Sequence, residues 1–124
     1  MLSSFSGEFG VWYRSAYCAS KFAVNGFFES LRMELNEKMD FTVVCPITVQ
    51  TDFRNYSLIK TPTKATESEK GGSLTAKVAV DQIMSAADYR VHKFLFPFSP
   101  WMAMYTRSIF PGYITNKVKQ KASL

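Results

Sequence analysis

The sequence is poor in the residues that build disulfide frameworks and metal sites. It has two cysteines, Cys18 and Cys45, and one histidine, His92, among 124 residues. No Cys-x-x-Cys or His-Glu-x-x-His spacing is present, so the sequence predicts neither a disulfide scaffold nor a metal site. This cysteine usage fits a reducing compartment, and we expect a cytoplasmic protein. Both thiols are expected to be buried as small hydrophobic side chains.

Long apolar runs and clustered charge are also missing. No uninterrupted apolar segment reaches the roughly 18 residues that a membrane-spanning helix needs. The formal net charge is +5, but only one stretch is locally basic, through Lys117, Lys119 and Lys121. A nucleic-acid surface gathers basic and aromatic side chains on one face. We therefore predict a solvated basic tail and no nucleic-acid partner.

The hydrophobic pattern predicts an alternation of helices and strands. Residues 1–14 are expected to form the end of a strand and a loop that contains Ser4, and this segment is here called the serine loop. The segments expected after it are a helix (15–38), a buried strand (41–47), a polar loop (51–73), a helix (74–88), a strand (90–98) and a helical tail (99–124). Continuous apolar, β-branched strands are typical of buried parallel sheets, so the predicted class is α/β. Two strands cannot make a sheet covered on both faces, and we expect part of a larger one.

Both helices carry apolar stripes that predict which side faces the core. In the first helix, apolar side chains recur every four residues at Ala19, Ala23, Phe27, Leu31 and Leu35. In the second helix the inward side chains are expected to be Val78, Ile83, Ala86 and Ala87.

The first helix also carries a tyrosine and a lysine four residues apart, in the stretch YCASK. On a helix, residues four apart are neighbours on one face, so Tyr17 and Lys21 should project side by side. An ammonium a few ångströms away favours a phenolate, which makes a phenol a better proton donor at neutral pH. Taken alone, the pair is explained better by an ordinary solvated helix contact than by a proton donor.

Two further motifs accompany this pair. Ser4 lies thirteen residues before Tyr17, in SSFSGEFG, and the strand that follows runs into Pro46 and then Thr51, in FTVVCPITVQTDF. With the Tyr-x-x-x-Lys spacing, these motifs resemble the signature of the short-chain dehydrogenase/reductase family over residues 3–53. Three correctly spaced motifs together are far more specific than any one of them.

The resemblance implies a role for each matched residue. Tyr17 would transfer a proton to or from the substrate oxygen while a hydride moves between carbon and nicotinamide. Lys21 would assist this transfer, and both side chains would contact the nicotinamide ribose. Ser4 would hold the carbonyl or hydroxyl oxygen of the substrate.

The resemblance also assigns the residues that follow the strand. The positions that match the family's contacts with the nicotinamide end of NAD or NADP are Pro46, Ile47, Val49 and Thr51. Residues 51–73 would form the substrate lid. The family has glycine where this chain has Ile47, whose side chain could crowd the cofactor or force a different turn.

Two features of the family are absent from this sequence: the glycine-rich strand–turn–helix that seats the pyrophosphate, and the catalytic asparagine. We therefore expect the C-terminal half of a Rossmann-like doubly wound sheet, from an enzyme that interconverts an apolar carbonyl compound and its secondary alcohol. The alternative is a catalytically inactive, truncated family member that serves as an interaction or dimerisation module.

Partners are expected at two surfaces. The family's signature helix commonly packs against its symmetry mate, which predicts a homo-oligomer, with a partner helix contacted by Phe22, Phe28 and Met33. The aromatic tail has three interpretations: a cap over the substrate pocket, a dimer surface, or a peripheral membrane contact anchored by Trp101, Tyr105 and Tyr113.

Overall fold

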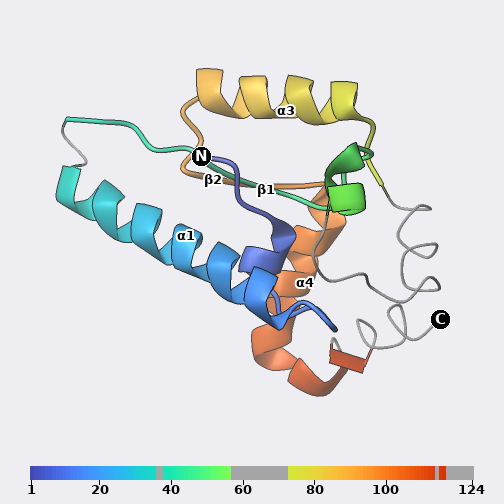
Figure 1. Cartoon of the computed structure of the whole chain (residues 1–124). Coiled ribbons are helices and arrows are strands. Elements are labelled where there is room, and N and C mark those ends of the chain that lie inside the picture. The colour runs from blue at the N-terminus through green and yellow to red at the C-terminus, as the bar shows by residue number, and fades with distance from the viewer. Residues whose placement is uncertain (36–37, 57–72, 114, 117–124) are drawn as a thin grey trace.

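The computed structural model describes residues 1–35, 38–56, 73–113 and 115–116. Helices and strands alternate along the chain (Figure 1). In order, they are the 3₁₀ helix η1 (Phe5–Gly7), α1 (Ser15–Leu35), β1 (Val43–Pro46), the 3₁₀ helix η2 (Asp52–Tyr56), α3 (Ala76–Asp88), β2 (Lys93–Phe96) and α4 (Phe98–Ile109). This arrangement confirms the predicted α/β class.

The strands β1 and β2 pair in parallel. The register places Val43 opposite Lys93 and Pro46 opposite Phe96. All four residues of β1 are buried, as is typical of a parallel strand whose two faces are covered. The chain passes through α3 between the two strands, because parallel strands require a crossover connection. The result is one βαβ unit.

The N-terminal residues lie along the other edge of β1. The amide of Ser3 donates to the carbonyl of Val44 at 2.8 Å, and the amide of Val44 donates to the carbonyl of Met1 at 2.9 Å. Val43, in contrast, donates to the carbonyl of His92, which precedes β2. The serine loop therefore leaves the sheet directly beside β1.

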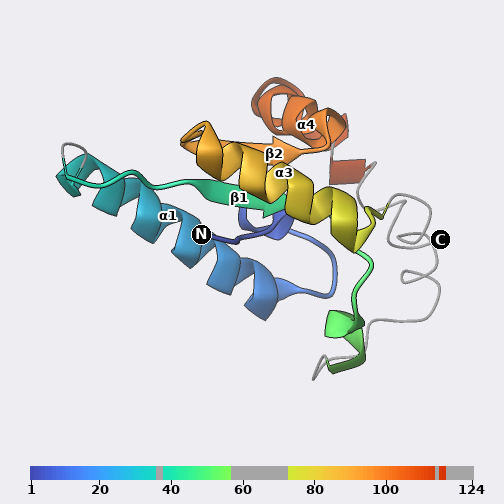
Figure 2. The same ribbon diagram turned by 90° about the horizontal axis from the view of Figure 1, so that it is seen from above.

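The two long helices, α1 and α3, cover opposite faces of the strands, as Figures 1 and 2 show. The premise that a two-stranded sheet is not covered on both faces is therefore wrong for this chain. On the α3 side the buried core consists of Val44, Ala79, Ala86 and Phe96. On the α1 side it consists of Val43, Cys45 and Leu95, with Phe5 and Phe28 packed against them. Cys45 is 1% exposed and Cys18 is 6% exposed, which confirms that both thiols are buried.

The core-facing stripe of α1 differs from the predicted one. Ala19 and Ala23 are exposed, and Phe27 exposes 60% of its surface. The helix instead turns the side of Lys21 and Asn25 toward the serine loop, where both side chains form hydrogen bonds with its backbone. The inward side also carries Cys18, which is buried, and Phe28, which packs against the strands. It therefore buries apolar side chains and satisfies backbone groups of the loop at the same time.

Helix α3 is also rotated relative to the prediction. Val78 exposes 44% of its surface, whereas Ala79 and Ala86 are buried, and Ile83 packs against them. Ala87 is exposed. Small alanines allow the helix to approach the strands closely, so they occupy the buried line in place of the larger Val78.

Some predicted segments extend beyond the observed elements or beyond the described residues. The strand expected over 90–98 ends at Phe96 because α4 begins at Phe98. Residues 36–37 of the first helix, 57–72 of the lid, and 114 and 117–124 of the tail lie outside the described residues. Within the described part of the chain, no helix has the length and apolar character needed to cross a bilayer.

The three interpretations of the tail stay predictions. Tyr105 and Tyr113 each expose more than half of their surface, which is compatible with a cap, a partner or a membrane surface. The side chain of Trp101, the third proposed anchor, lies outside the described residues.

Candidate active site

Helix α1 carries Tyr17 and Lys21 at successive turns on its inward side. Both side chains are half-buried, and the Lys21 Nζ lies 5.7 Å from the centre of the Tyr17 ring. The same Nζ lies 3.5 Å from the carbonyl oxygen of Leu2. The ammonium therefore contacts both the phenol ring and the segment that leads to Ser4.

Ser4 lies at the start of η1, two residues after Leu2. Its backbone is extended, and its Oγ accepts a hydrogen bond from the amide of Ser6 at 3.2 Å. This contact is an N-cap, which holds the hydroxyl at the beginning of the turn. Ser4 and Lys21 thus belong to two elements, η1 and α1, that lie against each other. The Ser4 oxygen is engaged by its own turn.

The serine loop approaches α1 so closely that only glycine fits at position 7. A Cβ atom built on Gly7 would lie 2.7 Å from Asn25 Nδ2, 2.9 Å from the carbonyl oxygen of Lys21 and 3.0 Å from Ser3 Oγ. The second of these atoms belongs to the helix backbone, which cannot move without disturbing α1. Here glycine permits the close approach of two backbones.

The segment after β1 reaches Tyr17 through an aromatic contact. The ring centres of Tyr17 and Phe53 lie 6.4 Å apart, and Phe53, in η2, exposes 68% of its surface. Tyr17 is therefore adjacent to the beginning of the segment predicted to form the lid. An exposed phenyl ring beside the phenol offers an apolar surface to a ligand.

The four positions assigned to the cofactor lie at the carboxyl end of β1 or just after it. Pro46 is its last residue, and Ile47 donates its amide to the carbonyl of Phe96 at 3.3 Å. Val49 bridges to the chain segment before α3, and Thr51 is exposed. In open α/β sheets, ligands bind outside the carboxyl ends of the strands, and these positions lie there.

The residues present fit one end of a nicotinamide cofactor. The Lys21 ammonium has three donors, and its hydrogen bond to the Leu2 carbonyl is long, at 3.5 Å; Thr51 is exposed and carries a hydroxyl. A pyrophosphate requires a glycine turn at a helix N-terminus. The sequence has no such motif, and no described glycine has positive φ. The side chains present, those of Lys21 and Thr51, therefore suit the nicotinamide ribose and not the pyrophosphate.

Sequence reasoning missed a polar cluster next to this site. Lys93 Nζ lies 2.8 Å from Glu8 Oε1 and 3.8 Å from Glu29 Oε2. Asn25 Nδ2 donates to the same Glu8 Oε1 at 2.7 Å and to the carbonyl of Gly7 at 3.1 Å. One signal could have revealed it: Asn25 stands eight residues after Tyr17, on the helix face that also carries Lys21.

The cluster shifts the protonation equilibria of its members. Burial by itself lowers the pKa of Lys93, but the hydrogen bond to Glu8 and the charges of Glu8 and Glu29 outweigh it, so the pKa is raised overall. Burial raises the pKa of the neighbouring Cys45 thiol, and the charge of Glu8 acts in the same direction. Lys93 therefore stays charged and Cys45 stays a neutral thiol.

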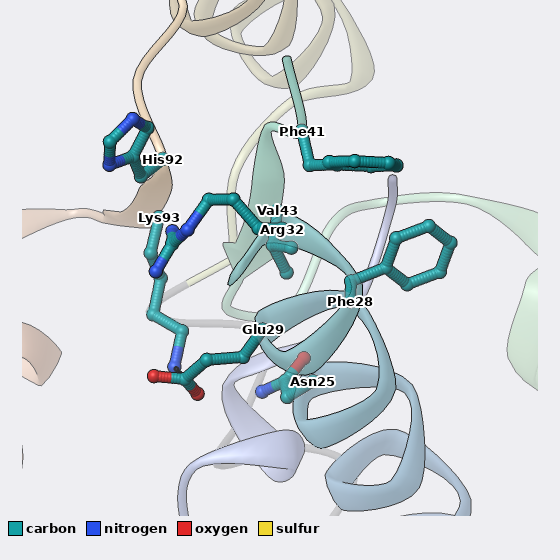
Figure 3. A pocket seen from close by; sticks show the side chains of 8 residues that line it. All are labelled: Asn25, Phe28, Glu29, Arg32, Phe41, Val43, His92 and Lys93. Atoms are coloured by element: carbon teal, nitrogen blue, oxygen red, sulfur yellow. Dashed lines mark ion pairs between the residues drawn. The ribbon is translucent and has the colours of Figure 1, made fainter. Parts of the chain in front are cut away.

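A small cavity of about 70 Å³ opens beside the cluster (Figure 3). Its lining residues are Asn25, Phe28, Glu29, Arg32, Phe41, Val43, His92 and Lys93. They gather at the amino ends of β1 and β2, opposite the end that the cofactor positions follow. This cavity is therefore separate from the predicted site.

Comparison with known proteins gives matches along the whole chain. A family model described as short chain dehydrogenase matches residues 1–61. The Dictyostelium discoideum protein named dehydrogenase/reductase SDR family protein 7-like is 33% identical over 114 residues, which cover 92% of this chain and 35% of that protein. The Mus musculus dehydrogenase/reductase SDR family member 7B is 31% identical over 125 residues, which cover 98% of this chain and 39% of that protein.

A shorter match has a higher identity. The Xenopus laevis hydroxysteroid 11-beta-dehydrogenase 1-like protein B is 50% identical over 46 residues, which cover 35% of this chain and 16% of that protein. In each of these three comparisons the chain spans well under half of the length of the curated relative.

Proposed function

The chain belongs to the short-chain dehydrogenase/reductase family, and we propose that it supplies the proton-transfer site of an oxidoreductase that interconverts a carbonyl and a secondary alcohol. The observation that carries this proposal is the position of the Lys21 ammonium 5.7 Å from the Tyr17 ring on the inward side of α1. A phenol with an ammonium beside it is suited to general acid–base catalysis.

In the reduction direction, Tyr17 donates its phenolic proton to the oxygen of the carbonyl substrate. The positive charge of Lys21 stabilises the phenolate that remains. In the oxidation direction, the same phenolate accepts the proton of the alcohol. Proton transfer by a positioned side chain contributes roughly 10² to 10⁴-fold to a rate.

Ser4 holds the substrate oxygen in this proposal. Its Oγ already accepts a hydrogen bond from the amide of Ser6, and a hydroxyl that accepts one bond still has its proton to donate. The Ser4 proton can therefore point outward to a carbonyl oxygen. Two donors, from Ser4 and Tyr17, would then share that oxygen and stabilise the charge that develops on it.

NAD or NADP would supply or accept the hydride. Lys21 would bind its nicotinamide ribose, and the positions after β1 that would line the nicotinamide are Pro46, Ile47, Val49 and Thr51. This chain thus provides one end of the cofactor site, and the proposal requires a pyrophosphate-binding segment in addition to residues 1–124. The chain spans well under half of the length of its relatives, so activity is proposed for a protein that joins this chain to such a segment.

An apolar substrate is supported by the side chains around Tyr17. Phe53 contacts the Tyr17 ring and is 68% exposed, and Tyr56, three residues later, is 84% exposed. An exposed aromatic ring beside a polar reactive group favours a ligand with an apolar body and an oxygen to react. The name of the Xenopus laevis relative refers to a hydroxysteroid, an alcohol on an apolar ring system.

The experiment uses the chain alone and a chimera that joins to it the preceding part of the Dictyostelium discoideum relative. Each is incubated with NADH or NADPH deuterated at the transferring position of the nicotinamide and with a panel of apolar ketones. We expect the chimera to form alcohols with deuterium on the carbinol carbon. The absence of a labelled alcohol from both preparations, when the relative itself is active, would contradict the proposal.

A second candidate function is an interaction module, and the outer surface of α1 favours it. Phe22, Phe27 and Met33 expose 44%, 60% and 73% of their surfaces. Phe28, which was expected to join them, is half-buried and packs against the α1-side core. An apolar helix face of this kind favours association with a second copy of the chain.

Sedimentation measures this association directly. We expect a dimer that Phe27→Ser converts to a monomer, whereas Ala76→Ser, at the exposed start of α3, leaves it unchanged. A monodisperse monomer of the unmodified chain at micromolar concentration would remove the interaction module as a candidate.

A further inference from the structure

The inward side of α1 carries a third polar residue beside the two with proposed roles in proton transfer. Tyr17, Lys21 and Asn25 follow one another at successive turns, and the last two reach the segment that contains Ser4. Asn25, at 4% exposure, is buried. Its Nδ2 donates to the carbonyl of Gly7 at 3.1 Å and to Glu8 Oε1 at 2.7 Å.

Glu8 is in turn held by the sheet. Lys93, the first residue of β2, places its Nζ 2.8 Å from Glu8 Oε1, and the two side chains are 29% and 13% exposed. A partly buried, charge-assisted contact of this length is stronger than a surface ion pair. One carboxylate oxygen therefore links the serine loop to α1 through Asn25 and to β2 through Lys93.

Helix α4 adds a third contact to the same stretch. The Arg107 Nη1 lies 3.4 Å from the carbonyl oxygen of Glu8, and its guanidinium lies 4.7 Å from the centre of the Phe9 ring. Residues 7–9 are thus fixed by two helices and a strand. On one side of Ser4, the amide of Ser3 is held by the carbonyl of Val44 in β1. On the other side, the Ser4 hydroxyl contacts its own turn, so there the position of Ser4 depends on where residues 7–9 are anchored.

We propose that Asn25 and Glu8 are positioning residues, which hold the serine loop against α1 and thereby set the distance between the Ser4 hydroxyl and Tyr17. This inference rests on the proposed function for the roles of Ser4 and Tyr17. Asparagine suits the task because its amide supplies two donors from a short side chain. Leucine has a similar size but would leave the Gly7 carbonyl and the Glu8 carboxylate without that donor in a buried place.

The first test is a double-mutant cycle in the preparation that forms the alcohol. Asn25→Leu should lower kcat about tenfold and leave KM for the cofactor unchanged, because a small displacement of a reacting group is costly. In a Ser4→Ala background the same substitution should change kcat less than about twofold, since Asn25 acts through Ser4. Equal losses of kcat in both backgrounds would overturn the proposal, because a residue that only stabilises the fold lowers kcat by the same factor whether or not Ser4 is present.

The second test does not depend on activity. Amide hydrogen exchange of the chain is compared between residues 3–9 and α3, as a measure of local opening. We expect Asn25→Leu to speed exchange in 3–9 about tenfold and to leave α3 unchanged. Ser30→Ala, an exposed substitution on the same helix, should change neither segment. Unchanged exchange in 3–9, or equal acceleration in both segments, would overturn the proposal.

A milder variant covers the case in which Asn25→Leu does not fold. Glu8→Gln keeps an oxygen that accepts from Asn25 but removes the charge that pairs with Lys93. We expect about threefold faster exchange in 3–9, and Asp40→Asn, which removes the exposed ion pair with Arg90, serves as the control. If no preparation forms alcohol, the proposed function fails, and the exchange experiment still decides whether Asn25 and Glu8 anchor the loop.

Discussion

The Lys21 ammonium lies 5.7 Å from the centre of the Tyr17 ring, one turn further along α1. The same side of the helix packs on the serine loop, so the two side chains are held by the fold and not only by their spacing in the sequence. A reacting group on a packed helix keeps its geometry better than one on a loop. Changes to either side chain, or to the contact between helix and loop, should therefore have measurable effects.

Gly7→Ala should separate the serine loop from α1. The added methyl group would meet the backbone carbonyl of Lys21 and the side-chain amide of Asn25 at 2.9 Å and 2.7 Å, and such overpacking costs about 1–3 kcal/mol. We expect the free energy of unfolding in urea to fall by this amount. Gly10→Ala is the matched control, because among the described residues no atom beyond its two chain neighbours lies within 4 Å of its added Cβ. An equal loss in both variants would contradict the predicted clash.

Replacing Lys21 should impair both proton transfer and cofactor binding. Lys21→Met keeps much of the length of the side chain but removes the charge beside Tyr17. We expect kcat to fall at least about tenfold and KM for the cofactor to rise. Lys77→Met, on the exposed side of α3, should leave both constants within about twofold of the unmodified protein, and wild-type kinetics for Lys21→Met would exclude its assigned role.

The stability of the chain should depend on Lys93 at alkaline pH. Its pKa is raised in the folded chain above the ordinary value of 10.5, so the folded state holds this proton more tightly than the unfolded state. The stabilisation is therefore complete below about pH 10.5 and is lost as the pH rises through the folded-state pKa.

Urea denaturation of the unmodified chain and of Lys93→Met measures this effect. The difference in their free energies of unfolding should be constant near neutral pH and should narrow above about pH 10.5. A difference that stays constant at alkaline pH would show that the charge of Lys93 does not contribute through Glu8.

The two thiols should resist modification in the folded chain. Cys45 is 1% exposed, and burial together with the charge of Glu8 raises the pKa of its thiol, which disfavours the reactive thiolate. Cys18 is 6% exposed. We expect alkylation by iodoacetamide at pH 8 to become at least about a hundredfold faster in denaturant, and rapid alkylation of Cys45 without denaturant would contradict its burial.

The sequence predicted the order and type of the elements well, because the periods of the apolar residues are local properties. The helix over 15–38 and the strand over 41–47 correspond to α1 and β1, with ends that differ by a few residues. The side of each helix that faces the core was predicted less well. On α1, the alanines and Phe27 have the spacing of a buried stripe but are exposed, since contacts with the preceding serine loop, which a helical period does not encode, decide the rotation.

The candidate site shows the same division between local and distant information. The neighbourhood of Tyr17 and Lys21 follows from helix geometry alone, and the structure places them as that geometry requires. The contact between Glu8 and Lys93 joins residues 85 positions apart, and no spacing rule predicts such a pair. Single-sequence reasoning therefore finds residues that share an element and misses those that meet only through the sheet.

The central claim is that Tyr17 gives its proton to the substrate, and one comparison of rates tests it most directly. Tyr17→Phe and Tyr89→Phe are assayed beside the unmodified protein in the ketone reduction, with circular dichroism as the measure of folding. Tyr89 is 83% exposed at the end of α3, so it controls for the loss of a hydroxyl. We predict that Tyr17→Phe folds normally and loses at least about a hundredfold in kcat, while Tyr89→Phe keeps the original rate. Turnover by Tyr17→Phe within about twofold of the unmodified protein would contradict the claim.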